Sequence, residues 1–493
     1  MHDILKTDKY KFTMAEAGFP LRKETFYYTH RKNGPHFLPF DVKQEIINTV
    51  FGEWNSNFFK NSIEGAYEWL GENVITVSDA VREAFKFDSI SSLEINSLPA
   101  GSWFFDNEPV FTITGPSALV SWLEPTLIRF NYKIQLATLA LTDQTALFNE
   151  INTAVCGEHA QIIYNTISSL SEMGFKIPVK PIENIRPGPG RTSAYFDEIN
   201  KKAKDLVSIV KDPRRIFEVG MRSVTCKQQH ELALEACSKA KIKMTSSVYQ
   251  AWNLDINSVG TMGHEHVQRY GNDKEAFRAM ADRIPGSIFC LLDTFDTINS
   301  GLKHSYSLIR EQPERDHAIR FDSGDTEALF KEAYVTAQKY GIKPRFCFED
   351  GWNLEKTIKF ERIRESLGIS PERFLYGFGG YLTNTKFISL NRDRVGAVYK
   401  LCKTGDKNTM KFSDTPEKQS IPGKPVILRP RLTTSKNRNE TIVAQEGEEV
   451  VGDYVNAFEE PAIVQRPSKE PIRKIKYSNK TQEIINRLTR NKN

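Results

Sequence analysis

Residues 318–349, AIRFDSGDTEALFKEAYVTAQKYGIKPRFCFE, contain the pattern that decides the fold. Two short runs with aromatic and β-branched residues, 318–322 and 345–349, flank a segment in which apolar residues recur at helical spacing. Asp325 is a typical helix N-cap and Gly341 a typical helix end, so we expect a helix over 325–341. A strand, a helix and a second strand in this order form a βα unit of a parallel sheet.

The same alternation extends from about residue 215 to residue 403. A second capped helix is expected over 353–368. Further strands are expected at 216–219, 258–262, 287–293, 374–378 and 397–401. So many successive βα units favour a closed barrel, although an open doubly wound sheet is an alternative.

The rest of the chain has weaker patterns. Residues 108–115 alternate as a half-buried strand, residues 119–141 show helical spacing with a break at Pro125, and NIRPGPGRT (184–192) has two Pro-Gly steps typical of an exposed loop. We therefore expect an α/β protein with an irregular (β/α) barrel and an α+β domain built from N-terminal and C-terminal segments. The expected parts are the N-terminal α+β domain (1–154), an insertion or partly flexible connection (155–210), the barrel with the active site (211–403), a C-terminal segment packed on the N-terminal domain (404–465) and a basic tail (466–493).

Composition excludes several classes of protein. Of 493 residues, 39% are hydrophobic and 26% charged, as in ordinary globular proteins. The most apolar stretch, 118–128, is too short for a membrane helix, and the N-terminus has no secretory apolar region. The six cysteines show neither C-x-x-C nor metal-ligand spacing, so we expect reduced core thiols and a cytoplasmic location. The net charge of +5 is concentrated in the tail, which we expect to be a solvated, partly helical terminus, and the nearly neutral remainder argues against a nucleic-acid-binding protein.

Charged residues and glycines follow the expected strands at their C-terminal ends, where ligands bind in parallel βα architectures. Arginine binds phosphate with two donors, carboxylates accept from ribose hydroxyls, and glycine lets backbone amides approach closely, so this set suits a phosphorylated sugar. Asp322-Ser-Gly-Asp325 alone is also an ordinary strand-to-helix turn with an N-cap. The position of such groups after successive strands is what favours one common site.

Several runs carry a family resemblance. They are TDKYKFTM (7–14), NEPVFTITGP (107–116), EVGMR (218–222), TSSV (245–248), GTMGHE (260–265), DTFD (293–296), RFDSGD (320–325), VYKL (398–401) and the signature from Lys411 to Lys424. Together they resemble the nicotinate phosphoribosyltransferase family, which is a type II phosphoribosyltransferase family. Residues 155–210 and the tail lie outside the resemblance.

The resemblance implies that nicotinate displaces diphosphate from phosphoribosyl diphosphate, giving nicotinate mononucleotide for NAD synthesis. It also implies ATP as co-substrate, Mg²⁺ as cofactor and transient phosphorylation of His264, whereas the metal ligands are not assigned. The catalytic residues that it implies are His264, Glu265, Asp322 and Asp350. The substrate-binding residues that it implies are Tyr10, Arg31, Val219, Arg222, Ser246, Asp293, Arg320, Gly351, Gly379, Gly380 and Lys400.

The family works as a homodimer with shared sites, so the resemblance implies that Tyr10, Arg31 and Lys400 act on the site of a second copy. The sequence departs from the family at Val219, Ser247 and His266, where relatives have Phe, Asn and Trp. Gly379-Gly380 and Asp350-Gly351 look closer to the sister family, nicotinamide phosphoribosyltransferase. The sister has an Asp at the position of Ser246, and a serine there favours the anionic nicotinate. The nicotinamide enzyme and a non-catalytic phosphoribosyl-binding paralogue are the alternatives.

Overall fold

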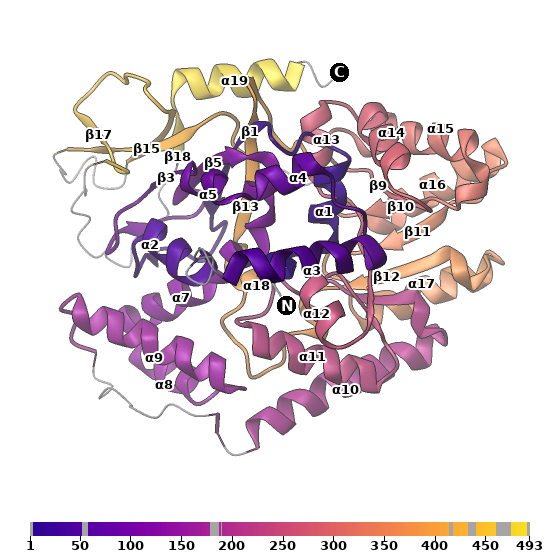
Figure 1. Ribbon diagram of the computed structural model, residues 1–493, viewed down its shortest axis with the longest axis horizontal. Helices are drawn as coiled ribbons and strands as arrows, with labels where there is room; N and C mark the ends of the chain where they lie inside the picture. The colour runs from indigo at the N-terminus through magenta and orange to yellow at the C-terminus, as the bar shows by residue number, and fades with distance from the viewer. Residues whose placement is uncertain are drawn as a thin grey trace.

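A computed structural model describes residues 3–51, 58–177, 187–188, 190–413, 418–431, 440–459 and 475–490. Their strands form a seven-stranded sheet, a five-stranded sheet, a four-stranded sheet and a two-stranded sheet. The seven-stranded sheet and its helices lie on the right of Figure 1, and the five-stranded sheet lies near the centre. Within these described ranges, no helix is long and apolar enough to cross a membrane.

The seven-stranded sheet is parallel throughout and confirms the expected α/β fold class. Its strand order is β8-β7-β6-β12-β11-β10-β9, so the sheet is a curled half-barrel whose edge strands are β8 and β9. The strands are β6 (Ile216–Glu218), β7 (Met244–Thr245), β8 (Asn257–Ser258), β9 (Phe289–Leu291), β10 (Ala318–Phe321), β11 (Arg345–Phe348) and β12 (Phe374–Phe378). The helices between them are α11 (Lys227–Lys239), α12 (Val248–Asn253), α13 (His264–Tyr270), α14 (Asp273–Arg283), α15 (Lys303–Glu311), α16 (Thr326–Tyr340) and α17 (Leu354–Ser366).

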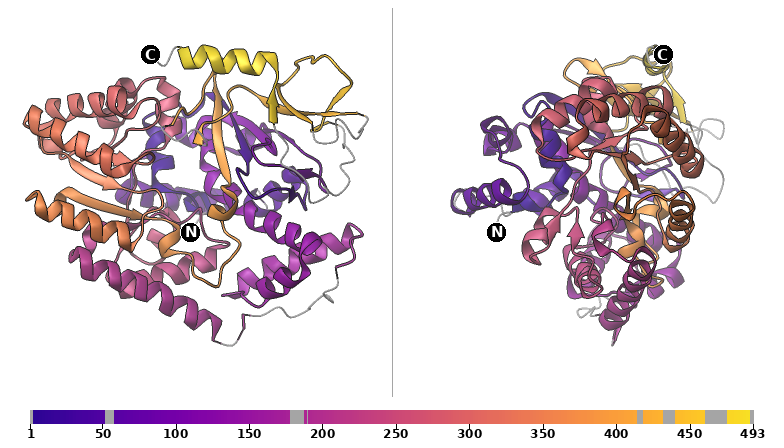
Figure 2. Two further views of the ribbon diagram at one scale, coloured as in Figure 1. Left: turned by 180° about the vertical axis from the view of Figure 1, so that it is seen from behind. Right: turned by 90° about the vertical axis from the view of Figure 1, so that its right-hand side faces the viewer.

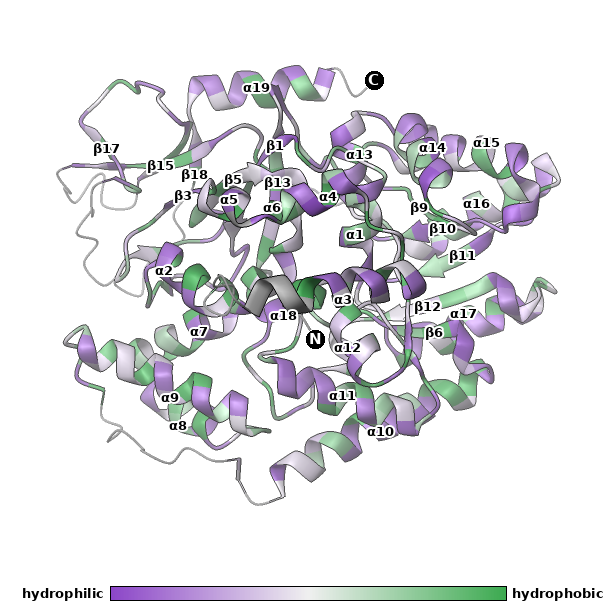
Figure 3. Ribbon diagram, in the orientation of Figure 1, coloured by the Kyte–Doolittle hydropathy of each residue, from purple (hydrophilic) through white to green (hydrophobic). Residues whose placement is uncertain are grey.

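Local sequence explains the central βα unit. Asp325 accepts hydrogen bonds from the amides of Glu327 and Ala328 and so caps α16, which ends at Gly341 with a φ of 65°. Phe330 on α16 packs against Phe346 and Phe374 on the sheet. Figure 3 shows strands such as β12 as largely apolar, whereas the covering helices carry polar and apolar residues side by side. Burial of one face of each helix against the sheet therefore builds the barrel core.

The expected strand at 397–401 does not belong to the barrel. It is part of β13 (Val398–Thr404), which pairs antiparallel with β1 (Lys23–Thr29). The only helices between β12 and β13 are a three-residue 3₁₀ turn, Gly380–Leu382, and the four-residue α18, Arg392–Val395. Neither is long enough for a helical crossover to another parallel strand, so the chain passes into the other sheet. The strand expected at 258–262 is also shorter than predicted, because β8 ends at Ser258.

The five-stranded sheet has the order β14-β13-β1-β5-β3 and belongs to the N-terminal domain. The run expected as a strand forms β5 (Phe111–Pro116), and the helical run forms α6 (Ser117–Trp122) and α7 (Glu124–Thr142), which divide at the expected break. Other elements of this region are the 3₁₀ helix Asp3–Leu5, the π-helix Ile47–Phe51, α1 (Lys9–Glu16), β2 (His36–Phe37), α2 (Val42–Ile46), α3 (Phe58–Asn73), α4 (Asp79–Ala84), α5 (Phe87–Ser91), β3 (Glu94–Ser97), β4 (Trp103–Phe104), α8 (Gln144–Ile151) and β14 (Lys407–Asn408).

Residues 155–210 differ from the expected insertion. They include α9 (Gly157–Glu172) and α10 (Arg191–Val210), and α10 buries Tyr195, Ile199 and Leu206 in the barrel core. The helical spacing of these apolar residues was the signal that the sequence interpretation missed. Most of NIRPGPGRT lies outside the described residues, so the loop expected there is not tested.

The C-terminal part forms a mixed sheet with the order β17-β15-β16-β18 and one helix. Its elements are β15 (Pro425–Pro430), β16 (Thr441–Gln445), β17 (Tyr454–Asn456), β18 (Ile475–Tyr477) and α19 (Asn479–Arg490). The described part of the basic tail is thus more ordered than a solvated terminus, since β18 pairs with β16 and α19 buries Thr481 and Ile484. Both views in Figure 2 show α19 at the edge of the molecule above this sheet.

A buried arginine joins three elements of the barrel wall. Arg215 donates to the backbone oxygens of Phe374 on β12 and Val210 on α10, and it forms an ion pair with Glu361 on α17. We expect Arg215→Met to lower the free energy of unfolding by about 3 to 5 kcal/mol, because it leaves a buried carboxylate with one partner fewer. Urea unfolding measures this loss. Arg214→Met is the matched control, since the Arg214 side chain is 86% exposed, and its unfolding midpoint should not change; equal midpoints for the two variants would contradict the prediction.

Candidate active site

A cavity of about 460 Å³ opens at the C-terminal ends of the parallel strands. Its lining comes from the barrel loops, from α1 and from β13, so segments far apart in the sequence share it. The volume lies in the range of small-molecule sites. Of the predicted site residues, only Asp293 is absent from the lining, and it lies directly behind His264.

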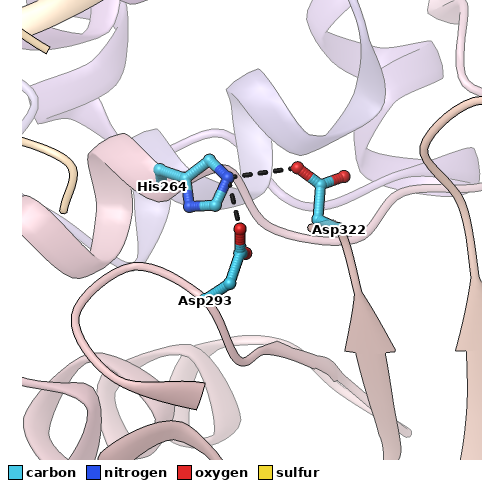
Figure 4. A group of neighbouring side chains, drawn as sticks. All are labelled: His264, Asp293 and Asp322. Carbon is cyan, nitrogen blue, oxygen red and sulfur yellow. Dashed lines mark hydrogen bonds and ion pairs between the residues drawn. The ribbon is translucent and has the colours of Figure 1, made fainter. Parts of the chain in front are cut away.

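His264 is the first residue of α13 and contacts both predicted carboxylates (Figure 4). Its Nε2 lies 3.2 Å from Asp322 Oδ2 and 3.6 Å from Asp293 Oδ1, and its Nδ1 lies 3.1 Å from Thr294 Oγ1. Burial, together with the charge of Lys411, lowers the pKa of His264 to about 4. The imidazole is therefore neutral at physiological pH.

Lys411 determines which nitrogen of His264 carries the proton. Its Nζ lies 2.7 Å from His264 Nε2 and 2.9 Å from Asp293 Oδ2. An ammonium group can only donate, and its 2.7 Å contact with Nε2 is shorter than the 3.2 Å contact of Nε2 with the Asp322 carboxylate. We therefore assign the lone pair to Nε2 and the ring proton to Nδ1, where Thr294 accepts it. His264 thus holds its nucleophilic nitrogen toward the cavity, shielded by a lysine.

The same geometry bears on metal binding. Among the described residues, His264, Asp293 and Asp322 form the one group whose ligand atoms lie within 4.8 Å of one another. The Lys411 ammonium already occupies the position between the histidine and Asp293. This group therefore does not fit a resident metal ion while Lys411 stays in place.

Arg320 fixes Asp322. It donates to Asp322 Oδ1 at 2.6 Å, pairs with Glu349 at 3.2 Å and also donates to Thr261 and to the backbone oxygen of Met262. Although burial raises the pKa of Asp322, Arg320 outweighs it and holds that pKa well below its usual value. With most of its donors used by the protein, Arg320 acts on Asp322 more than on a ligand phosphate, which differs from the expected role.

At one end of the cavity, Tyr10 and Arg222 lie close together. The guanidinium of Arg222 lies 6.0 Å from the centre of the Tyr10 ring and 3.3 Å from Glu124 Oε1. A flat aromatic ring beside an arginine suits a planar anion such as a pyridine carboxylate. Val219, also in the lining, adds an apolar wall.

Ser246 does not keep carboxylates away from the position expected for the base, contrary to the expectation from the sequence. Ser246 Oγ donates to Asp8 Oδ1 at 2.6 Å, so a carboxylate lies beside this position after all. Burial raises the pKa of Asp8, and Arg222 lies 3.9 Å from its other oxygen. The positive charge that favours an anionic base here comes from Arg222, not from the absence of an acid.

The contacts of Glu265 indicate a role other than the expected catalytic one. Its Oε1 accepts from Lys11 Nζ and from Ser121 Oγ, each at 2.7 Å. Lys11 also pairs with Glu124, which in turn holds Arg222. Glu265 is therefore a positioning residue at the base of this network.

The other end of the cavity is cationic. Arg31, Lys400, Lys411 and Arg392 line it, and Lys400 forms no side-chain ion pair with any described residue. Burial, followed by the charges of Lys411 and Arg31, lowers the pKa of Lys400 to about 7. Lys411 is paired with Asp293 and Arg392 with Asp393, so the four cations outnumber the acids paired with them, and such a group is suited to bind a diphosphate.

Two loops complete this end. The Gly379-Gly380 turn lies against the Asp393 and Asn384 side chains, where a Cβ on Gly380 would approach within 3 Å of both. Asp350 and Gly351 follow β11 with left-handed φ values of 61° and 63°. Lys418 joins the loop after β11 to the loop after β10 by donating to Asp350 Oδ2 at 2.7 Å and to the backbone oxygen of Asp322.

The contribution expected from a second subunit stays a prediction. Tyr10, Arg31 and Lys400 line the cavity of their own chain. Pairing of β13 with β1 brings Arg31 and Lys400 there, because Arg31 follows β1 and Lys400 lies on β13. The sequence interpretation also did not select Asp8, Lys11, Glu124, Glu349, Lys411 and Lys418, most of which stand in the runs quoted for the resemblance.

Comparison with known proteins agrees with the site. The model of the "Nicotinate phosphoribosyltransferase (NAPRTase) family" matches residues 215–444. A nicotinate phosphoribosyltransferase of Bacillus subtilis is 29% identical over 44% of this chain and 41% of its own length. One of Methanosarcina mazei is 24% identical over 85% of this chain and 94% of its own length, and one of Caenorhabditis elegans is 25% identical over 86% and 73%.

Solved structures show the same fold. A putative nicotinate phosphoribosyltransferase of Saccharomyces cerevisiae superposes with a TM-score of 0.58 and 18% identity, covering 85% of this chain and 95% of that chain. The enzyme of Vibrio cholerae gives a TM-score of 0.56 and 17% identity, with coverages of 85% and 90%.

The arrangement of Lys411 predicts the titration of His264. In Lys411→Met the pKa of His264 should rise from about 4, because a neighbouring cation is lost while Asp293 and Asp322 stay. NMR titration of the imidazole measures the shift. Lys418→Met is the control, since Lys418 contacts Asp350 and a backbone oxygen, and its His264 should titrate as in the unaltered chain. An unchanged pKa in Lys411→Met would show that the two groups are not in contact.

Proposed function

Since residues 215–444 belong to the nicotinate phosphoribosyltransferase family, we propose that this chain forms nicotinate mononucleotide and diphosphate from nicotinate and phosphoribosyl diphosphate. One observation carries the proposal. A single cavity is lined by an aromatic ring with Arg222 beside it, by the carboxylates of Asp322 and Asp350, and by the cations Arg31, Lys400 and Lys411. These three kinds of group match the pyridine carboxylate, the ribose and the diphosphate of the two substrates.

The base binds between Tyr10 and the apolar wall at Val219, with its carboxylate toward Arg222. A charge-assisted contact of this kind contributes about 1.5 to 3 kcal/mol. The pyridine nitrogen then faces the ribose carbon that loses diphosphate. Its attack forms the new C–N bond as the C–O bond to diphosphate breaks.

The ribose lies beside Asp322. Because Arg320 keeps this carboxylate ionised, it can accept from ribose hydroxyls and offset the positive charge that develops on the sugar as diphosphate leaves. Asp350 lies on the loop after β11, where Lys418 holds it, and it accepts from hydroxyls of the same sugar. Glycines 379 and 380 take the 5′-phosphate on their backbone amides.

Diphosphate leaves toward Arg31, Lys400 and Lys411. Mg²⁺ enters with the phosphates as part of the substrate, since the two carboxylates beside His264 already have partners, Asp293 in Lys411 and Asp322 in Arg320. Binding of a polyanion brings neutralising charge to Lys400, whose pKa then returns toward that of an ordinary ammonium.

ATP acts as co-substrate through His264. The neutral imidazole with its Nε2 lone pair is a competent nucleophile for a γ-phosphoryl group, and Nδ1 is already held by Thr294. Lys411 uncovers Nε2 when it moves from the ring to the incoming phosphate. The new N–P bond forms as the bond between the γ-phosphorus and ADP breaks.

Base selectivity tests the reaction. Diphosphate release from phosphoribosyl diphosphate is measured with nicotinate or nicotinamide, with and without ATP and Mg²⁺. We expect nicotinate to be used in preference and ATP to stimulate turnover. His264→Asn should lose the ATP effect and keep a basal rate, because its amide cannot be phosphorylated at nitrogen. Turnover of nicotinamide alone would identify the sister activity, and no turnover of either base would favour a non-catalytic paralogue. Persistence of the ATP effect in His264→Asn would contradict the phosphohistidine.

Mixing two inactive variants tests whether one chain supplies the complete site. Tyr10→Ala removes the aromatic ring and Asp322→Asn removes the sugar carboxylate, and both residues line the same cavity of the same chain. A mixture of the two variants, co-expressed and purified together, should be no more active than either alone. If subunits exchanged these residues, one site in a mixed dimer would be intact and activity would recover, which would contradict the arrangement described above.

A further inference from the structure

Two cysteines lie in contact outside the active site. Cys156 and Cys226 are 70 residues apart in sequence, yet their Sγ atoms are 3.5 Å apart in the interior. The side chains are nearly completely buried, and all six cysteines of the chain are free thiols. No other pair of cysteines among the described residues is in sulfur–sulfur contact.

Each of the two cysteines is the N-cap of a long helix. Cys156 precedes α9 and Cys226 precedes α11, with almost identical extended backbone angles of (−152°, 170°) and (−154°, 171°). Helix N-termini stabilise negative charge and so favour thiolates. The two sulfurs therefore lie where the positive ends of two helices meet.

The two helix ends hold each other in register. The Glu158 carboxylate of α9 accepts from the amides of Lys227 and Gln228 at the start of α11. In return, the side-chain oxygen of Gln228 accepts from the amide of Glu158 at 3.0 Å. This reciprocal capping keeps the cysteines facing each other without using either sulfur.

A second cavity, of about 220 Å³, reaches the pair. Cys226 lines it together with Lys6, Arg129, Lys133 and Lys227. A small reagent can enter a space of this size. Cys226 is thus buried from bulk solvent but open to a small molecule, and Cys156 lies behind it.

The two thiols differ in acidity. The hydrogen bond with Cys226 and the backbone amides of His159 and Glu158 hold the pKa of Cys156 below its ordinary value. Burial raises the pKa of Cys226 well above its ordinary value. Cys156 is therefore the more acidic of the two thiols and the one on which a thiolate forms first.

We propose that Cys156 and Cys226 are a redox modification site, which a hydroperoxide entering the second cavity converts to a reversible disulfide. Cys226 Sγ transfers its proton to the Cys156 thiolate and attacks a peroxide oxygen, so that an S–O bond forms as the O–O bond breaks and hydroxide leaves. Cys156 then attacks the sulfenic sulfur, the S–S bond forms, the S–O bond breaks and water leaves with the Cys156 proton. Two sulfurs are oxidised and one peroxide is reduced.

The bond requires only a small movement. The sulfurs must approach from 3.5 Å to about 2.05 Å. Cys226 ends the loop that begins after β6 and carries Arg222 into the active site. Closure of the disulfide therefore pulls on the loop that holds the base-binding arginine. This consequence rests on the proposed function, whereas the disulfide itself does not.

Thiol counting with peptide mass spectrometry tests the site. The full-length protein is exposed to hydrogen peroxide, alkylated after unfolding and digested. We expect four alkylated cysteines and a linked peptide pair containing Cys156 and Cys226, which dithiothreitol separates. Cys156→Ser and Cys226→Ser should each abolish the linked pair. Cys237→Ser, which removes another buried thiol of α11, should keep it.

Six alkylated cysteines after peroxide, or a disulfide that involves other cysteines, would overturn the proposal. The coupling to the active site has its own readout. Oxidation should raise KM for nicotinate in the unaltered chain, dithiothreitol should restore it, and Cys226→Ser should be insensitive to peroxide. An unchanged KM in a protein shown by mass to be fully linked would overturn the coupling.

Discussion

Antiparallel pairing of β13 with β1 is the constraint on which the site depends. A parallel half-barrel supplies carboxylates, a histidine and a glycine turn at its C-terminal edge, but few cations free to meet phosphate. The β13–β1 ladder places Arg31 and Lys400 over that edge, and the chain that continues from β13 returns Lys411 to His264. The N-terminal helix α1 then closes the opposite end with Tyr10. Without this ladder the barrel edge would lack Arg31 and Lys400.

The buried acids around the cavity are paired with buried cations, two of which serve two acids each. Arg320 serves Asp322 and Glu349, Lys411 serves Asp293, and Lys11 serves Glu124 and Glu265. Ion pairs of this kind contribute little net stability, because desolvation offsets most of the attraction. What they provide is fixed ionisation and position. A carboxylate that stays charged beside the sugar stabilises the positive charge of the transition state, and this effect is larger than its contribution to the stability of the fold.

The sequence was sufficient for the parts of the fold that depend on local pattern. The βα repeat, the capped helix α16 and the break between α6 and α7 follow from periodicity and capping residues, and the structure confirms them. The sequence was insufficient for the elements whose position depends on pairing with distant parts of the chain. Residues 397–401 have the composition of a barrel strand, and only the lack of a crossover helix sends them to another sheet. The same holds for the site. The motifs contain Asp8 and Lys411, but they do not show that Asp8 contacts Ser246 or that Lys411 contacts His264.

The cationic end of the cavity shows why this region is built for a ligand and not for stability. A buried lysine whose pKa is lowered to about 7 prefers the neutral form in the folded state, whereas the unfolded chain holds it fully charged. Its burial therefore opposes folding at every pH below the ordinary lysine pKa, and the opposition reaches its full size once the pH falls below about 7. Four neighbouring cations would not collect around one space in a structure selected for stability alone. A bound polyanion offsets the repulsion between these cations and so stabilises the folded state. The same unpaired positive charge that destabilises the empty fold therefore favours the binding of phosphate.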